Sequence, residues 1–475
     1  MKKTVIVGGG ITGLATAFTL KERGYSGFVL IESSTRWGGK ITSAEKDGFL
    51  VEGGPDSFLA QKKATLELCS RLGLESDLVG SNSGKNSTTY VWSKKHLHPM
   101  PEGMMLMAPT MVLPFLKSRL ISWAGKMRMG LEVLIPKRRS DEDESLGSFV
   151  RRRLGNEALD KIAGPLMGGI HAADPERLSL KSTFPMFNEI EKKHGSLLRG
   201  MMKKPKHAPQ PGQKRPSMFV SLRGGLKQLA NALVTALPPQ SLISGCCVLS
   251  VHPENGQYRV ILSNGGSILA DDIVFATPSH VTADLVQQID QLLASRLRGI
   301  RYVSTATVSL GFRRKDIRHP MQGAGFIVPQ KEGRRITACS WSSEKFKHRA
   351  PEDCVLLRVF IGGAMAENLA EQSDEELIAV AREEIRTMMG IEAQPVLTSA
   401  YRWHKGNPQY EVGHEQRLLE IERALAGLPG LHLAGAAYRG AGIPDCIQSG
   451  IKAAESVLAR QIIAIEKNEL ATAGS

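Results

Sequence analysis

The chain opens with a pattern of apolar and polar positions that is typical of a nucleotide-binding unit. A run of β-branched residues at 4–7 predicts a buried strand, and small or apolar side chains recur at helical spacing through 11–23. A second apolar run at 28–31 predicts the next strand, and it is followed directly by Glu32. The pattern therefore predicts a strand, a helix and a parallel second strand.

The turn between the first strand and the helix has the spacing G-x-G-x-x-G. Gly8 permits a tight turn, Gly10 lets the backbone approach a pyrophosphate, and Gly13 lets the helix pack closely on the strand. The helix N-terminus offers free N–H groups to phosphates, and Glu32 is placed to accept ribose hydroxyls. An acid here argues against NADP, but the motif alone does not separate NAD from FAD. The contacts expected from this unit are Gly8, Gly9, Gly10, Ile11, Thr12, Gly13, Glu32 and Ser33.

Two further glycine-rich segments favour FAD. Arg36-Trp-Gly-Gly-Lys40 lets backbone crowd the cofactor and places Lys40 near a phosphate, an element that NAD dehydrogenases do not need. The turn 52–58 carries two glycines and a proline, and its N–H groups can lie against an isoalloxazine ring. A strand at 243–251 is expected to pass the adenine. The contacts expected from these segments are Gly39, Lys40, Gly54, Pro55, Asp56, Ser57 and Val248.

Residues 81–217 change character. Helical stretches between 121 and 167 and a Pro-rich basic segment at 203–217 predict a helical insertion closed by a linker. Its methionines and leucines leave two interpretations open: core packing, or an apolar face that touches a membrane or holds a large flat ligand. At 165–174 two glycines are predicted to break a helix and expose backbone to a ligand, with a plain loop as the alternative.

The rest of the chain returns to the nucleotide domain and then builds a second sheet. Short strands between 303 and 361 and near 396–402, with a helix at 374–389, predict a mainly antiparallel domain. A last strand at 431–436 opens through a glycine-rich turn into a helix reaching about Ile465. The N-terminus of this helix can stabilise the N1–O2 edge of a reduced flavin. The contacts expected from this turn are Ala436, Gly442, Ile443 and Asp445.

These patterns predict an α/β fold, α+β overall, with three parts. The FAD-binding Rossmann-like domain is expected at 1–80, 218–300 and 411–475. The substrate-binding domain, with its antiparallel sheet, is expected at 301–410 with flanking pieces. The helical insertion at 81–217 is expected to contact a membrane or to form the substrate cleft.

Composition and charge narrow the function classes. The net charge is +14, but its short basic runs carry no nucleic-acid motif, and such runs are most often solvated faces. The six cysteines lack the spacing of metal ligands or of a disulfide framework, which indicates a reducing cytoplasm and no metal site. The sequence starts directly on the first strand, so we expect no signal peptide, and no apolar run is long enough to span a bilayer.

The motifs resemble those of the protoporphyrinogen/coproporphyrinogen oxidase family, within the flavin amine oxidase superfamily. The variant is similar to the soluble type of Gram-positive bacteria, which acts on coproporphyrinogen III. The cofactor loops are shared widely in the superfamily, and the later motifs are more specific to the family. These later motifs are His98-Pro-Met-Pro101, the segments 165–174 and 178–185, Arg402-Trp-His404, Pro408-Gln-Tyr410, Gly413-His414, Gly435-Ala-x-Tyr-x-Gly440 and Ile443-Pro-Asp-Cys446.

The resemblance implies non-covalent FAD, oxygen as acceptor and release of hydrogen peroxide in heme biosynthesis. It also implies Trp403 as a cofactor contact and the backbone of Gly169 as the group that orients the substrate. A lone loop histidine such as His171 is more often structural. Oxidising a porphyrinogen removes hydrides from carbons next to pyrroles, whose nitrogens supply electrons, so we expect positioning residues rather than a strong base. The four propionates of coproporphyrinogen fit the positive charge better than two.

Several alternatives stay open. The same fold acting on protoporphyrinogen IX is the nearest, and an amine oxidase or a phytoene desaturase-like enzyme is more distant. A flavin-binding scaffold without turnover belongs to a different class. For the cell, we expect a cytoplasmic protein, peripheral at the inner face of the membrane through weak surface contact. Transient contact with neighbouring heme-pathway enzymes is a further expectation, and nucleic acid is not an expected partner.

Overall fold

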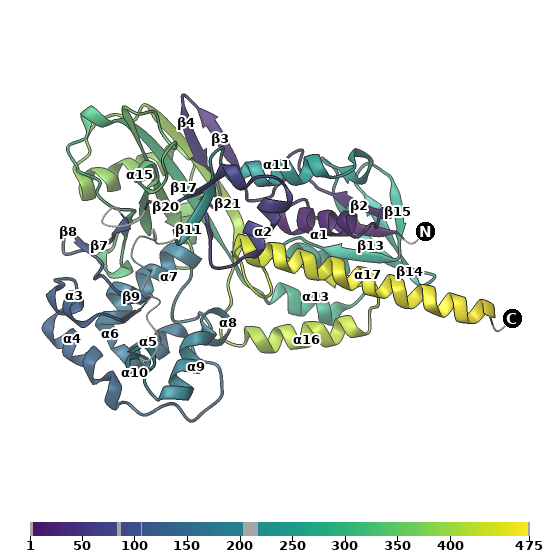
Figure 1. The fold of residues 1–475 in the computed structure, drawn as a ribbon, viewed down its shortest axis with the longest axis horizontal. Helices are drawn as coiled ribbons and strands as arrows, with labels where there is room; N and C mark the ends of the chain where they lie inside the picture. Colours follow the sequence, from purple (N-terminus) through teal and green to yellow (C-terminus); the bar gives the residue numbers. More distant parts are fainter. Residues whose placement is uncertain (1–2, 83–86, 106, 203–216, 474–475) are drawn as a thin grey trace.

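The computed structural model describes residues 3–82, 87–105, 107–202 and 217–473. Figure 1 shows a cofactor domain on one side, and a domain with a large sheet above a helical insertion on the other. Helix α17 (Ile443–Ala473) runs along the cofactor domain and continues beyond the end predicted near Ile465. Of the linker predicted at 203–217, only Ser217 lies within the described residues. Among the described residues, no helix has the length and apolar character needed to cross a membrane.

A parallel sheet forms the centre of the cofactor domain and confirms the predicted Rossmann-like unit. Its strands follow the order β12 (Leu242–Ile243), β2 (Phe28–Ile31), β1 (Thr4–Val7), β16 (Asp272–Phe275) and β22 (Leu431–Leu433). Every residue of β1 is buried, because layers cover both faces of the sheet. Alternating side chains divide the core: Ile6 joins the cluster under the helices of one face, whereas Val5 and Val7 join the cluster of the other.

The two faces of this sheet carry different layers. Helices α1 (Ile11–Glu22), α11 (Lys227–Ala236) and α17 cover one face, together with α2 (Ala64–Arg71). The other face carries a small antiparallel sheet and three helices. These are β13 (Val248–Glu254), β14 (Gln257–Leu262), β15 (Ser267–Ala270), α12 (Ser279–Val286), α13 (Gln291–Arg298) and α16 (His414–Ala426).

The second domain is a seven-stranded sheet packed against α15 (Asp374–Met389). Its pairs are antiparallel except for β18 and β7, which run parallel, so the predicted antiparallel domain is confirmed in its main part. The strand order is β21 (Leu397–Pro408), β17 (Tyr302–Arg313), β20 (Cys354–Gly362), β19 (Ala338–Trp341), β18 (Gly325–Ile327), β7 (Thr89–Ser93) and β8 (His96–Pro99).

The position of β7 and β8 differs from the predicted boundary of the insertion at residue 81. The two strands form the expected hairpin, but β7 pairs with β18 and extends the large sheet. Val91 in β7 is fully buried in the core of the insertion, whereas Trp92 faces the core of the second domain. Because consecutive strand residues point to opposite faces, this hairpin joins the two cores.

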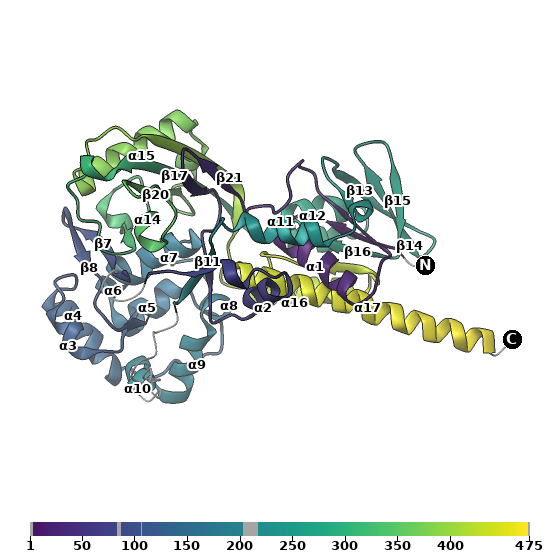
Figure 2. The same cartoon turned by 45° about the horizontal axis from the view of Figure 1, so that its top comes forward.

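The insertion itself is a group of short helices around one core, as predicted. Figure 2 shows most of these helices below the large sheet, with α7 between the sheet and the others. The helices are α3 (Val112–Lys117), α4 (Trp123–Gly130), α5 (Leu146–Leu154), α6 (Asn156–Ala158), α7 (Gly164–His171), α8 (Leu180–Thr183), α9 (Pro185–His194) and α10 (Leu197–Met202).

One feature of α7 contradicts the sequence analysis. The two glycines at 168 and 169 do not break the helix, which continues to His171 and ends at Ala172 in the left-handed conformation (φ 52°). Glycine costs only about 1 kcal/mol in a helix interior relative to alanine, so tertiary packing overrides it here.

A fully buried ion pair ties the insertion together. The guanidinium of Arg153 donates to the carboxylate of Glu132, and both side chains are 0% exposed. The Glu132 carboxylate also accepts hydrogen bonds from the Ser196 hydroxyl (2.5 Å) and the Leu197 N–H (2.8 Å) at the start of α10. This network fixes the relative positions of its side chains, because a buried charge is costly unless an opposite charge lies beside it.

We expect Glu132→Gln to lower the free energy of unfolding by about 3–5 kcal/mol, because it removes the nearer of the two carboxylates that compensate the buried Arg153 charge. The other, Glu191, lies 3.5 Å away and is shared with Arg152. Denaturant unfolding of the purified protein measures this loss. The matched control is Glu383→Gln, whose partner Arg386 is 59% exposed. It should leave the free energy of unfolding nearly unchanged, because water screens this pair. Equal effects of the two variants would contradict the prediction.

Candidate functional site

The glycine-rich turn after β1 has the backbone geometry that the sequence predicts. Gly8 has a φ of +107°, and an added Cβ on Gly13 would lie 1.9 Å from the Gly8 carbonyl oxygen. A Cβ on Gly10 would meet only the Cα of Gly39, at 4.0 Å, so the space in front of Gly10 is open. Helix α1 begins there without a side-chain cap and without an acid in its first turn. Its free N–H groups therefore suit an anionic ligand.

Glu32 directly follows the C-terminal end of β2, as the sequence predicts. Its carboxylate accepts hydrogen bonds from the N–H of Gly9 (2.6 Å) and of Ser34 (2.9 Å), and from the Ser33 hydroxyl (3.3 Å). The Cys246 N–H donates to the Glu32 carbonyl (3.1 Å), which brings the start of β13 alongside. This arrangement places the predicted adenine-side residue Val248 two positions further along the same segment.

The two other predicted loops converge on the first. The Gly38 N–H donates to the Gly9 carbonyl (2.8 Å), which holds the segment 36–40 against the turn. A Cβ on Gly54 would lie 1.8 Å from the carbonyl oxygen of Lys40, so the turn 53–57 packs on the same segment. The Lys40 ammonium donates to the carbonyl of Gly406, at the end of the second domain's sheet. Three separate loops within the first 57 residues therefore form one cradle.

Side chains from the second domain hold the turn 53–57. The Gly53 carbonyl accepts hydrogen bonds from the indole N–H of Trp403 (2.8 Å) and from the Thr307 hydroxyl (3.3 Å). Asp56 forms an ion pair with Lys345 (2.9 Å). Burial raises the pKa of Asp56, but the Lys345 ammonium and the guanidinium of Arg358 together hold it well below its ordinary value. Asp56 therefore stays ionised.

Lys345, Arg358 and Thr307 were not predicted as site residues. Each lies in a strand or helix whose local sequence has an ordinary apolar or polar pattern, and each reaches the site only through tertiary pairing. A buried arginine in the middle of the apolar strand β20 is the one signal that the sequence offers, because buried charges are nearly always paired.

The turn between β22 and α17 brings the last predicted residues to the same place. The Gly435 N–H donates to the Ser449 hydroxyl (2.9 Å), and Asp445 pairs with Lys62 (2.6 Å). A Cβ on Gly450 would lie 2.4 Å from the Thr12 carbonyl oxygen, so α17 packs directly on α1. Two helix N-termini therefore open side by side, with Ala436, Gly442, Ile443 and Asp445 around the second.

Gly169 lies on the opposite side, at the boundary between the insertion and the large sheet. A Cβ added there would meet Ile327 at 3.5 Å and Ala338 at 3.7 Å. The N–H groups of Ala172 and of the next residue both donate to the Met167 carbonyl, so they do not cap the Gly169 carbonyl. The last carbonyls of a helix lack intrahelical donors, which leaves this oxygen available to a ligand.

Two ionisable side chains near these loops, Lys40 and His171, have lost much of their hydration. Lys40 and His171 are each partly accessible, yet burial lowers the pKa of both groups, for His171 to about 4. Neighbouring protein atoms therefore surround much of each side chain, and we call the space beside them the recess. The residues present fit an anionic dinucleotide: open glycine backbone, the uncapped N-terminus of α1, the nearby N-terminus of α17 and Lys40.

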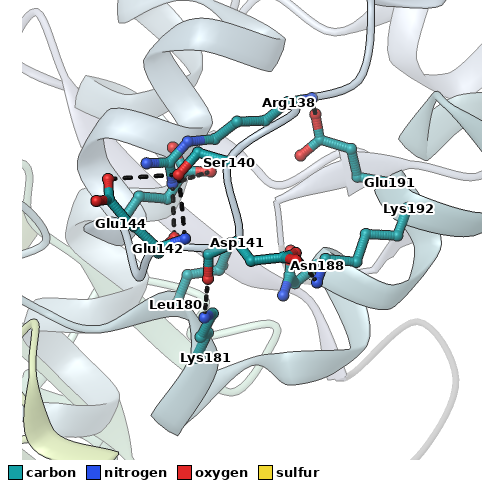
Figure 3. A pocket seen from close by; sticks show the side chains of 10 residues that line it. All are labelled: Arg138, Ser140, Asp141, Glu142, Glu144, Leu180, Lys181, Asn188, Glu191 and Lys192. Atoms are coloured by element: carbon teal, nitrogen blue, oxygen red, sulfur yellow. Dashed lines mark hydrogen bonds and ion pairs between the residues drawn. The ribbon is translucent and has the colours of Figure 1, made fainter. Parts of the chain in front are cut away.

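A cavity on the insertion does not have these properties. It has a volume of about 10 Å³, which suffices for roughly one water molecule. Figure 3 shows that its charged side chains interact with one another, as in the ion pair of Lys192 with Asp141 (2.6 Å). We therefore assign it no ligand.

Comparisons with known proteins agree with this geometry. A family model described as flavin containing amine oxidoreductase matches residues 11–458. The chain is similar to coproporphyrinogen III oxidase of Bacillus subtilis strain 168, with 38% identity over 96% of this chain and 98% of that protein. It is also similar to coproporphyrinogen III oxidase of Staphylococcus aureus, with 36% identity over 96% of this chain and 99% of the relative.

A solved structure is similar along nearly the whole chain. It comes from Exiguobacterium sp. 255-15 and is assigned provisionally as a protoporphyrinogen oxidase. The TM-score is 0.85 at 33% identity, covering 96% of this chain and 98% of the other. The arrangement of cofactor domain, large sheet and insertion is therefore shared with this protein.

We expect Gly10→Ala to abolish dinucleotide binding while leaving the fold intact. The new Cβ meets nothing closer than 4.0 Å in the protein, so the free energy of unfolding should change by less than about 0.5 kcal/mol. The same Cβ fills the space in front of the first N–H groups of α1, so the cofactor content of the purified protein should fall at least tenfold. Gly13→Ala, which forces a 1.9 Å contact, should instead destabilise the fold. A fully loaded Gly10→Ala protein would contradict the assignment.

Proposed function

The chain belongs to the family of flavin containing amine oxidoreductases, and within it we propose that this protein oxidises coproporphyrinogen III to coproporphyrin III. Its cofactor would be non-covalent FAD, with oxygen as acceptor and hydrogen peroxide as the second product. The observation that carries the proposal is the similarity over 96% of the chain, insertion included, to relatives named for this reaction.

The cradle supports an assignment of roles to the predicted cofactor residues. The N-terminus of α1 and the open backbone at Gly10 would bind the pyrophosphate, and Glu32 would accept the ribose hydroxyls after releasing the Gly9 N–H. The turn 53–57 and the N-terminus of α17 would flank the flavin ring. Bound flavin supplies the hydride acceptor, and the protein supplies position and exclusion of water.

The ionisation states near the recess support a site that works by positioning. Burial lowers the pKa of His171 to about 4, which keeps its ring neutral at pH 7. The imidazole therefore does not act as a general acid at this pH. The pyrrole nitrogens of the substrate supply the electrons that expel a hydride, so the chemistry needs no strong base from the protein. The Gly169 carbonyl would accept a hydrogen bond from the pyrrole N–H groups and so orient the macrocycle.

Cys446 bears on the difference from flavoenzymes that bind their cofactor covalently. Its thiol is 7% exposed, and burial raises its pKa to about 11. The thiolate is the reactive form, so this cysteine is inert at neutral pH. The observation favours a non-covalent cofactor and argues against an amine oxidase with a cysteinyl link.

An exposed apolar face of the insertion supports the expected contact with the inner face of the cell membrane. Between 103 and 139 the sequence carries seven basic residues, of which Lys126 is buried, and one acid, Glu132, which is fully buried. Basic side chains beside exposed apolar residues and a tryptophan are the pattern of a surface that docks on anionic lipid. The exposed apolar residues are Met111, Val112, Leu113, Leu116, Trp123, Met127, Leu131 and Leu134.

The purified yellow protein should oxidise coproporphyrinogen III under air, with the rise of porphyrin fluorescence matched by release of hydrogen peroxide. Acid precipitation should leave the flavin in the supernatant. Turnover of protoporphyrinogen IX in parallel tests the nearest alternative, and a strong preference for it would overturn the choice of substrate. A flavin-loaded protein that oxidises neither compound would be a scaffold instead.

Binding to vesicles tests the membrane contact. The wild-type protein should sediment with phosphatidylglycerol vesicles at low salt and much less with phosphatidylcholine vesicles, because the basic residues need anionic lipid. Leu113→Glu, in the apolar face, should weaken this binding about tenfold or more. The control Leu292→Glu replaces a leucine of similar exposure on α13, 61% against 70%, and should bind as wild type. Equal binding of both variants would refute the docking face.

A further inference from the structure

The segment 409–413, between β21 and α16, lies where the three parts of the molecule meet. The side-chain amide of Gln409 donates to the carbonyl of His171 at the end of α7 (3.3 Å). The backbone carbonyl of Tyr410 accepts from the N–H of Ser179, in the insertion (2.7 Å). One side of this segment is therefore bound to the insertion, close to the helix that carries Gly169.

The side chain of Tyr410 enters the turn 434–442 between β22 and α17. Its hydroxyl donates to the Ala436 carbonyl (2.6 Å) and accepts from the Gly440 N–H (2.8 Å). One hydroxyl thus closes the turn across four residues. Tyr410 is 7% exposed, and burial raises the pKa of its phenol, so the hydroxyl stays protonated and keeps both bonds at neutral pH.

His414 stacks on Tyr410 and contacts a third residue of the same turn, Tyr438. The two rings stack with centroids 4.3 Å apart and an angle of 14° between their planes. The Nε2 atom of His414 lies 2.9 Å from the Tyr438 carbonyl, which fixes the proton on that nitrogen. Burial lowers the pKa of His414, so the ring is neutral and keeps this tautomer.

The turn cannot adjust freely at its other end. Its first glycine, Gly435, has a φ of +120°, and its N–H is bound to the Ser449 hydroxyl in α17. Helix α17 itself packs closely on α1, because a Cβ added at Gly450 would lie 2.4 Å from the Thr12 carbonyl oxygen. The shape of the turn therefore depends on the side chains that bind its backbone. Tyr410 and His414 hold it at Ala436, Tyr438 and Gly440, and Cys446 contacts the Ala441 carbonyl.

We propose that Tyr410 and His414 are positioning residues that hold the turn 434–442 in the form in which it meets the flavin, and that they couple this turn to the substrate side through segment 409–413. The inference rests on the proposed function in one respect, namely that this turn faces the flavin. Neither residue touches the cofactor or substrate in this account; both act through the backbone of Ala436, Tyr438 and Gly440.

Tyr410→Phe isolates the contribution of the hydroxyl. The variant keeps the ring and its stacking on His414 but loses both bonds to the turn. The turn then no longer holds the N-terminus of α17 at the N1–O2 edge, where negative charge grows on reduction. The reduced flavin should therefore bind about tenfold more weakly relative to the oxidised form, which corresponds to a midpoint potential about 30 mV more negative.

The matched control is Tyr258→Phe. The Tyr258 hydroxyl also donates to a loop carbonyl of the cofactor domain, that of Pro429 (3.1 Å), but it does not touch the turn 434–442. The potential of this variant should equal that of the wild type, although both variants lose a buried hydroxyl contact. Thermal unfolding shows whether each variant stays folded, and His414→Gln provides a second perturbation of the same turn if Tyr410→Phe does not.

Two measurements on the holoenzyme decide the question without porphyrinogen, so failure of the proposed reaction does not affect them. The first is the midpoint potential of the bound flavin. The second is hydrogen exchange at the Gly440 amide, which should be about tenfold faster in Tyr410→Phe than in Tyr258→Phe. Loss of flavin from Tyr410→Phe alone would also support the proposal. Equal potentials in the two variants, or unchanged exchange at Gly440, would overturn it.

Discussion

The approach of backbone to backbone at the head of the parallel sheet is the constraint on which the rest of the site depends. At Gly13 the helix lies against the carbonyl of Gly8, and at Gly54 the chain lies against the carbonyl of Lys40, both closer than any side chain permits. Three loops from different parts of the sequence can therefore share one small volume and still turn their N–H groups toward a ligand. Any residue larger than glycine at these two positions would separate the loops and open the recess to water.

The cofactor half of this arrangement could be predicted from the sequence because it is local. The apolar run before Gly8, the spacing of the glycines and the acid at the end of the next strand specify one βαβ unit within 32 residues. The pairing of β7 with β18 could not be predicted, because parallel pairing between strands more than 200 residues apart leaves no periodic signal. The continuous helix at the glycines of α7 could not be predicted for a related reason, since packing against the large sheet outweighs their low helix propensity.

The side chains that complete the site come from elements whose function has no local signature. Lys345 and Arg358 keep Asp56 ionised and hold the turn 53–57, yet they lie about 300 residues beyond it. A buried ion pair adds little net stability, because its attraction is largely offset by desolvation, but breaking it is costly. Such pairs therefore fix geometry rather than strengthen the fold. The same reasoning applies to Glu132 and Arg153 in the insertion.

A site without acid–base groups must fix the relative positions of cofactor and substrate from both sides. The flavin side is built on glycine backbone and on two helix N-termini, and the substrate side on α7, whose terminal carbonyls have no helical donor. These two sides belong to different domains and would drift independently without a rigid connection. Segment 409–413 is one such connection, because Gln409 binds the end of α7 while Tyr410 closes the turn 434–442. Together with the contacts of Trp403 and Lys345 to the turn 53–57, this segment limits how far the cofactor domain and the insertion can move relative to each other.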